Sequence, residues 1–239
     1  MFTDPEPCPH THPEATPGIL TVAGGLHPHS PHLTWRLTTL RSIMAMSLQD
    51  LSDTFTTGAA RQRGVHPRVL YRWLDNGEIV ELSRGVFRRA DAPPASYPDL
   101  LAVAYRAPRA VVCCVSDAAV HDLTDQLPVA VQIAMPTRDR PPRIAYPPTE
   151  VLRFATDTFE VGLTAVEAAP AEQVRIYDPA RTVVDLMRLR HRLGQPLAHA
   201  ALHRYLRRPD ARPGELLRLA DTLGAQGPLR RALDVATAG

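Results

Sequence analysis

Arginines gather between residues 61 and 89, a stretch with seven arginines against three acidic residues. A guanidinium group presents its donors as a planar fork, which can pair with a phosphate or with the acceptors of a guanine base. The polar side chains of HPRVLYRWLDNG and of the hairpin that follows are therefore candidates for contact with double-stranded DNA. The candidate residues are His66, Arg68, Tyr71, Arg72, Arg84 and Arg88.

The segment that carries most of these candidates has the pattern of a short amphipathic helix. Pro67 suits its first turn, and Asn76-Gly77 ends it. Leu70, Trp73 and Leu74 can pack inward, which leaves the polar side chains outside. A helix with this division of faces fits the major groove of DNA.

A second helix and a hairpin complete the unit predicted over residues 48–91. A helical pattern begins at Leu48, and in FTTGAARQRGV either Thr56 or Thr57 can cap a helix that ends near Gly64. IVELSRGVFRRA then alternates as two strands around a turn at SRG, where the arginines could contact DNA backbone or minor groove. This order predicts a winged helix-turn-helix. The alternative is that its arginines form an ordinary solvated face.

Whole-chain composition excludes several kinds of chemistry but does not identify a function. The net charge of +2 is too small to indicate nucleic acid by itself, and all 27 basic residues are arginines, so chemistry that needs a lysine ammonium is excluded. Three unevenly spaced cysteines indicate neither a disulfide framework nor a zinc site, and no long apolar run or signal peptide occurs. We expect a cytoplasmic protein with no cofactor, no metal, no catalytic residue and no membrane partner.

The first residues differ from the remainder in composition. Residues 1–47 are rich in proline and histidine and poor in aliphatic side chains, which predicts a disordered tail. Its histidines have no fixed geometry in which to hold a metal. Met1, Met44 and Met46 are all possible starts of the native chain.

Residues 97–239 predict a second, mixed α/β domain with a helical C-terminus, so the fold class is α+β. A helix over 97–106 is followed by AVVCCV as a strand and SDAAVHDL as a helix capped by Ser116. VAVQIAMP, RIAY, VLRFA, EVGLTAV and VRIY then predict short strands. Cys113 and Cys114, adjacent in a strand, should point to opposite faces.

The start of the helical C-terminus carries polar residues for which we favour a structural role. In DPARTVVDL, Asp178 can cap a helix, Pro179 suits its first position, and Arg181 and Asp185 lie one turn apart. His121 and Asp122 indicate a cap or surface pair. From residue 181 to 231, eleven arginines stand against four acidic residues, an excess of seven. That excess has three possible interpretations. It forms a second DNA-binding surface, it forms a surface for an acidic partner, or it reflects ordinary helix faces in a chain whose basic residues are all arginine.

The segments FTTGAARQRGV, LYRWLDNGEIVELSRGVFRR and YDPARTVVDLMR resemble the AbiEi antitoxins of type IV toxin-antitoxin systems, over about residues 48–190. The resemblance implies a winged-helix DNA-binding domain, a C-terminal antitoxin domain, repression of its own operon and a partner nucleotidyltransferase toxin. Relatives often have serine or threonine where this chain has His66.

The leading hypothesis is therefore a transcriptional repressor that binds operator repeats and acts as an antitoxin. It opposes the toxin either by binding it directly or without direct contact. The alternatives are an orphan winged-helix regulator without a toxin and a nuclease-related protein. The missing lysines and the lack of an acidic metal cluster weigh against the nuclease.

Overall fold

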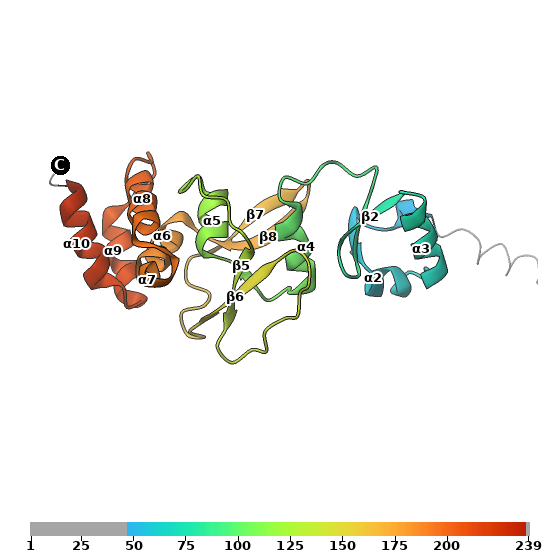
Figure 1. Ribbon diagram of the computed structural model, residues 1–239, viewed down its shortest axis with the longest axis horizontal. Helices are drawn as coiled ribbons and strands as arrows, with labels where there is room; N and C mark the ends of the chain where they lie inside the picture. Colours follow the sequence, from blue (N-terminus) through green and yellow to red (C-terminus); the bar gives the residue numbers. More distant parts are fainter. Residues whose placement is uncertain (1–46, 238–239) are drawn as a thin grey trace, which may run out of the picture. The chain divides into compact units, whose positions relative to one another are not determined.

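The structure is a computed structural model that describes residues 47–237 (Figure 1). Nearly all of the predicted tail, with its histidines and the three possible starts, lies outside the described residues. The described residues belong to one compact unit. Within the described part, the helices are too short or too polar to cross a bilayer.

Two sheets and a succession of helices make up this unit. The elements are, in chain order, η1 (Leu48–Asp50), β1 (Thr54–Thr56), α2 (Thr57–Gln62), α3 (Pro67–Asp75), β2 (Ile79–Ser83), β3 (Val86–Arg89), α4 (Pro98–Arg106), β4 (Val111–Val112), α5 (Cys114–Val120), β5 (Val131–Pro136), β6 (Thr149–Phe154), β7 (Leu163–Ala169), β8 (Glu172–Tyr177), α6 (Pro179–Arg188), α7 (Arg190–Leu193), α8 (Gln195–Leu206), α9 (Pro213–Thr222) and α10 (Gln226–Thr237).

The predicted winged helix is present, and the α+β fold class is confirmed. Thr56 caps α2 by accepting a hydrogen bond from the Ala59 amide at 3.1 Å. Helix α3 begins at Pro67, as predicted, and Asn76 is its C-cap. Strands β2 and β3 pair as an antiparallel hairpin, whose turn places Gly85 at φ 75°, a conformation that glycine adopts without strain.

The prediction that an α-helix begins at Leu48 is wrong. Leu48–Asp50 is one turn of 3-10 helix, closed by a capping box between Ser47 and Asp50. The chain becomes extended at Leu51 and forms β1, which pairs antiparallel with β3 and gives the three-stranded order β1-β3-β2.

A five-stranded sheet in the order β6-β5-β4-β8-β7 organises the rest of the chain. Its strands send alternate side chains to two separate cores. Val112, Ile133 and Ile176 face a core shared with α4. Val111 and Tyr177 face the other core, shared with α5 and the helices from α6 to α10, which gather together in Figure 1.

Three local predictions in this region are wrong. The strand at AVVCCV ends after Val112, so Cys113 and Cys114 do not alternate, and both side chains are fully buried. Helix α5 begins at Cys114, which places Ser116 inside the helix rather than at its cap. Residues 143–146, RIAY, form no strand in the structure.

The structural role predicted for the DPARTVVDL segment is confirmed. Asp178 caps α6 by accepting a hydrogen bond from the Arg181 amide at 2.7 Å, and Pro179 is its first residue. The Arg181 Nε lies 2.8 Å from Asp185 Oδ2, and both side chains are buried. His121 is the C-cap residue of α5, which agrees with the predicted cap. Its ring contacts the buried Asp117 at 3.1 Å, so the alternative of a surface pair with Asp122 is wrong.

Candidate nucleic-acid interface

Helix α3 is anchored by its apolar face. Leu70 and Trp73 are buried in the core of the winged helix together with Phe55 and Ile79. Leu74, predicted to face the same core, is only partly buried and packs at its edge. The inner face of α3 is therefore narrower than predicted.

The opposite face of α3 carries exposed polar side chains with no competing partner. Arg68 and Arg72 lie one turn apart and are exposed, and Tyr71 between them keeps 62% of its surface exposed. Within residues 47–237, neither arginine has a carboxylate partner. Both guanidinium groups therefore keep their full set of donors for a ligand.

His66 takes the N-cap position of α3. Its Nδ1 accepts a hydrogen bond from the Arg68 amide at 3.2 Å, so an imidazole acts as the cap where serine, threonine, aspartate or asparagine is preferred. The residue is exposed, which leaves Nε2 facing solvent at the leading turn of the helix.

The turn between β2 and β3 is held firmly at its base. The Gly85 amide donates to the Glu81 carboxylate at 2.9 Å, and the Gly85 carbonyl accepts from the Thr57 amide at 2.9 Å. Arg84 at this turn is exposed and has no ion-pair partner in the described part of the chain. The wing arginine therefore projects from a fixed backbone next to the start of α2.

Arg88, predicted to contact DNA, lies in the interior instead. Its side chain is 6% exposed, and its Nη1 lies 2.7 Å from the Glu172 Oε1 and 2.6 Å from the Thr54 hydroxyl. Its other guanidinium nitrogen donates to the Pro93 carbonyl. These bonds use the donors that a DNA contact would need, so we leave Arg88 out of the interface.

The same cluster joins the winged helix to the sheet that follows it. The Tyr105 hydroxyl donates to the Thr54 carbonyl at 3.0 Å and lies 3.3 Å from Glu172. Burial, with the neighbouring carboxylate, raises the pKa of Tyr105 to about 12, so its hydroxyl stays a donor at neutral pH. Leu82 of the wing adds apolar contact with the core under α4.

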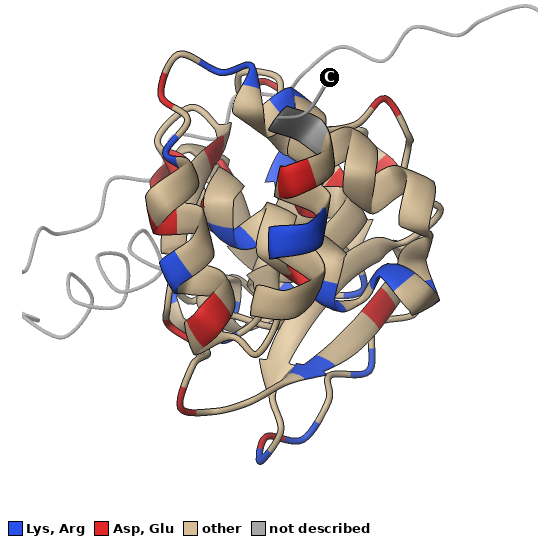
Figure 2. Cartoon of the chain, turned by 90° about the vertical axis from the view of Figure 1, so that its left-hand side faces the viewer, with Lys and Arg blue, Asp and Glu red and all other residues tan. Residues whose placement is uncertain are grey.

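The excess arginines of the C-terminal helices are in a different electrostatic state. Seven of the eleven have a carboxylate within 4 Å, including Asp125 and Glu150 from outside the helices. Figure 2, which looks onto these helices, shows basic and acidic residues interspersed. The two outside carboxylates reduce the excess of seven to about five. Most of the C-terminal arginines thus have a carboxylate beside them, whereas Arg68, Arg72 and Arg84 have none within residues 47–237.

A helix-turn-helix with a wing, exposing unpaired arginines on its second helix, defines the class of winged-helix DNA-binding domains. Residues 42–90 match the family model described as "Transcriptional regulator, AbiEi antitoxin". The predicted resemblance to this family is thereby confirmed over the winged helix, and the match does not extend past residue 90.

Comparison with solved structures gives a weaker similarity. The chain is similar to the "RV2827C protein from Mycobacterium tuberculosis", with 18% identity, a TM-score of 0.47, and coverage of 84% of this chain and 81% of that one. No curated protein matches the chain.

Proposed function

We propose that this chain is a sequence-specific transcriptional repressor whose helix α3 binds in the major groove of its operator. The observation that carries the proposal is the exposed, unpaired face formed by Arg68, Tyr71 and Arg72 on a helix anchored by Leu70 and Trp73. Nine helical residues span about 14 Å, a length that fits across the groove.

Each contact has a role that its chemistry suggests. Arg68 and Arg72 pair with guanine or clamp phosphates. His66 adds a contact at the leading turn, and Tyr71 adds one between the two arginines. Arg84 reaches the neighbouring backbone from the wing. Residues 48–91 are the DNA-binding domain of this proposal, and residues 97–239 are its antitoxin domain.

The finer proposal rests on the resemblance to the AbiEi family, whose description names a transcriptional regulator and an antitoxin. The chain represses its own operon and opposes a nucleotidyltransferase toxin encoded beside it. The second candidate is an orphan regulator that shares the DNA-binding domain and has no toxin. Both candidates bind DNA through the same domain. Only in the first does the C-terminal part oppose a toxin.

Growth and promoter activity, measured in the same cells, separate these candidates. Cells carry a reporter behind the DNA upstream of the chain's own coding sequence, and the adjacent gene under an inducible promoter. A repressor-antitoxin lowers the reporter signal and restores growth when the neighbour is induced. An orphan regulator lowers the reporter signal without any rescue of growth. A reporter that does not respond to the folded protein contradicts the repressor itself.

A further inference from the structure

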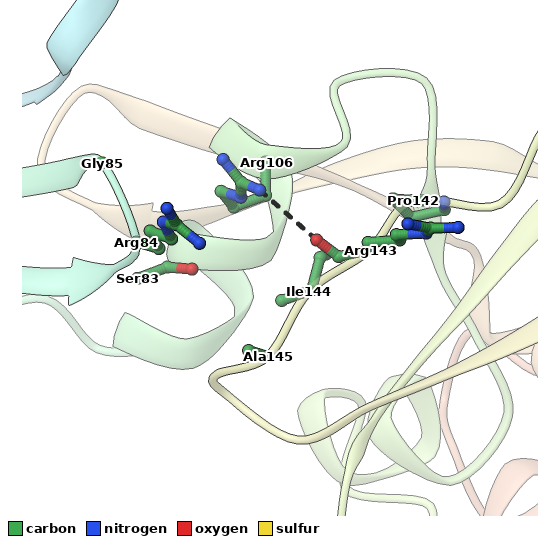
Figure 3. Close-up of a pocket in the computed structure, with 8 residues that line it drawn as sticks. All are labelled: Ser83, Arg84, Gly85, Arg106, Pro142, Arg143, Ile144 and Ala145. Carbon is green, nitrogen blue, oxygen red and sulfur yellow. Dashed lines mark hydrogen bonds between the residues drawn. The ribbon is translucent and has the colours of Figure 1, made fainter.

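A hollow of about 780 Å³ lies beside the wing, between the β2–β3 turn, the end of α4 and the loop after β5 (Figure 3). This volume is within the range of small-molecule sites. The residues that line it are Ser83, Arg84, Gly85, Arg106, Pro142, Arg143, Ile144 and Ala145.

Three arginines from separate elements share this hollow, and no carboxylate lines it. Arg84, Arg106 and Arg143 are all exposed, so each guanidinium can reach a ligand from solvent. Within residues 47–237, none of the three has an ion-pair partner. In Figure 3, the guanidinium groups of Arg84 and Arg106 lie on one side of the hollow, and the exposed Arg143 side chain extends from the loop away from them. An anion in the hollow would be attracted by these unpaired charges.

The walls of the hollow are tied together by hydrogen bonds. The buried Ser83 hydroxyl donates to the Tyr146 carbonyl at 2.6 Å, which joins the wing to the loop. Arg106 donates to the Arg143 carbonyl at 3.3 Å, the bond drawn in Figure 3. Asp139, the one acidic residue of the loop sequence TRDRPPR, lies 3.1 Å from Arg109 and so does not neutralise the hollow.

We propose that this hollow is a binding site for a phosphoryl group, held by the guanidinium forks of Arg84 and Arg106, with the exposed Arg143 side chain turning in from the loop to join them. Planar guanidinium groups match the oxygens of a phosphate, and three of them suit a group with more than one negative charge. The phosphate belongs either to a free phosphorylated small molecule or to a DNA backbone that continues past the wing. Only the second source rests on the proposed function.

Calorimetric titration of the full chain with inorganic pyrophosphate at low salt tests the site without DNA. We expect saturable binding that Arg106→Ala and Arg143→Ala each weaken about tenfold, because each removes a charge-assisted contact. Arg140→Ala is the matched control. Arg140 is an exposed arginine of the same loop that does not line the hollow, and its loss should leave the titration unchanged.

The same variants, titrated with duplex DNA across a salt series, identify the source of the phosphate. For a backbone phosphate, Arg143→Ala lowers the slope of log K against log salt by about one unit, and Arg140→Ala does not. For a free ligand, the slope is unchanged while pyrophosphate binding is lost.

The proposal is overturned if Arg106→Ala and Arg143→Ala behave like Arg140→Ala in both titrations. Failure of the proposed function gives a different pattern. In that case the parent protein shows no specific DNA binding, and pyrophosphate binding still depends on Arg106 and Arg143.

Discussion

Replacing Arg181 with alanine is expected to lower the free energy of unfolding by about 3 to 5 kcal/mol. The guanidinium is fully buried, and it donates to Asp185, to the Thr158 carbonyl at 2.9 Å and to the Val161 carbonyl at 2.6 Å. It also lies 4.3 Å from the ring centroid of Tyr177. Alanine leaves the buried Asp185 with Arg188 as its remaining guanidinium partner and removes the donor from the two carbonyls.

The groups around Arg181 cannot compensate for the stability that its removal costs. Burial raises the pKa of Asp185, and the two guanidiniums of Arg181 and Arg188 oppose that rise. Without Arg181, the carboxyl has one counter-charge fewer and becomes more costly to ionise. Gly162, at φ 72°, also fits closely, because an added Cβ would lie 2.7 Å from the Arg181 Cβ.

Chemical denaturation of Arg181→Ala beside Arg192→Ala measures the effect. Arg192 pairs with Glu150 at the surface, where its side chain is 56% exposed, so its loss should cost below about 1 kcal/mol. Arg181→Lys should lie between the two, because it keeps a charge without the fork. Equal midpoints for the two alanine variants would show that the buried pair contributes no more than a surface pair.

Arg88→Ala is expected to cost a similar amount, about 3 to 5 kcal/mol, because it leaves the carboxylate of Glu172 largely buried and without its guanidinium partner. The variant should lose DNA affinity only as far as the winged helix unfolds. The salt slope of the folded fraction should equal that of the parent protein, since Arg88 makes no phosphate contact.

A double variant distinguishes the structural role from a DNA contact. Replacing both charges, as in Arg88→Met with Glu172→Leu, should recover most of the lost stability, because apolar pairs of similar volume replace buried ion pairs at little cost. Thermal melts and a salt series on the single and double variants provide the data. An Arg88→Ala protein with parental stability and a slope lower by one unit would return Arg88 to the DNA interface.

Local signals predicted the elements that carry the candidate interface. The cap at Thr56, the proline at the start of α3, the Asn76 end and the glycine turn of the hairpin all act within a few residues of one another. Such short-range interactions can be inferred from sequence spacing alone. This is why the bounds of α2 and α3 and the hairpin agree with the structure.

The features that were missed depend on distant partners. Strand β1 has three residues and forms because all three pair with β3, about thirty positions further along the chain. Arg88 is buried because Glu172 meets it from 84 positions away, a pairing that charge counting cannot detect. Apolar Leu82 in the predicted wing was the available signal that this hairpin packs against another part of the chain.

The proposed phosphoryl site could not be predicted from the sequence for the same reason. Arg84, Arg106 and Arg143 are widely spaced in the sequence, and only the folded chain brings them around one hollow. The run of arginines in TRDRPPR was visible in the sequence, but its relation to the wing was not.

The salt dependence of operator binding by an Arg68→Ala, Arg72→Ala double variant tests the central claim most directly. The ligand is duplex DNA from upstream of the chain's own coding sequence, and Arg218→Ala in α9 is the control for a basic surface on the C-terminal helices. Leu70→Ala is the folding control, expected to cost about 2 to 5 kcal/mol of stability by leaving a cavity.

If an arginine contacts a base, its loss should lower specific affinity by about 1 to 3 kcal/mol. If it clamps a phosphate, its loss should lower the slope of log K against log salt by about one unit. The melting temperature of the double variant should match that of the parent protein, and Arg218→Ala should bind like the parent. A double variant that binds as tightly as the parent, with Arg218→Ala weakened, would contradict the account and place the DNA surface on the C-terminal helices.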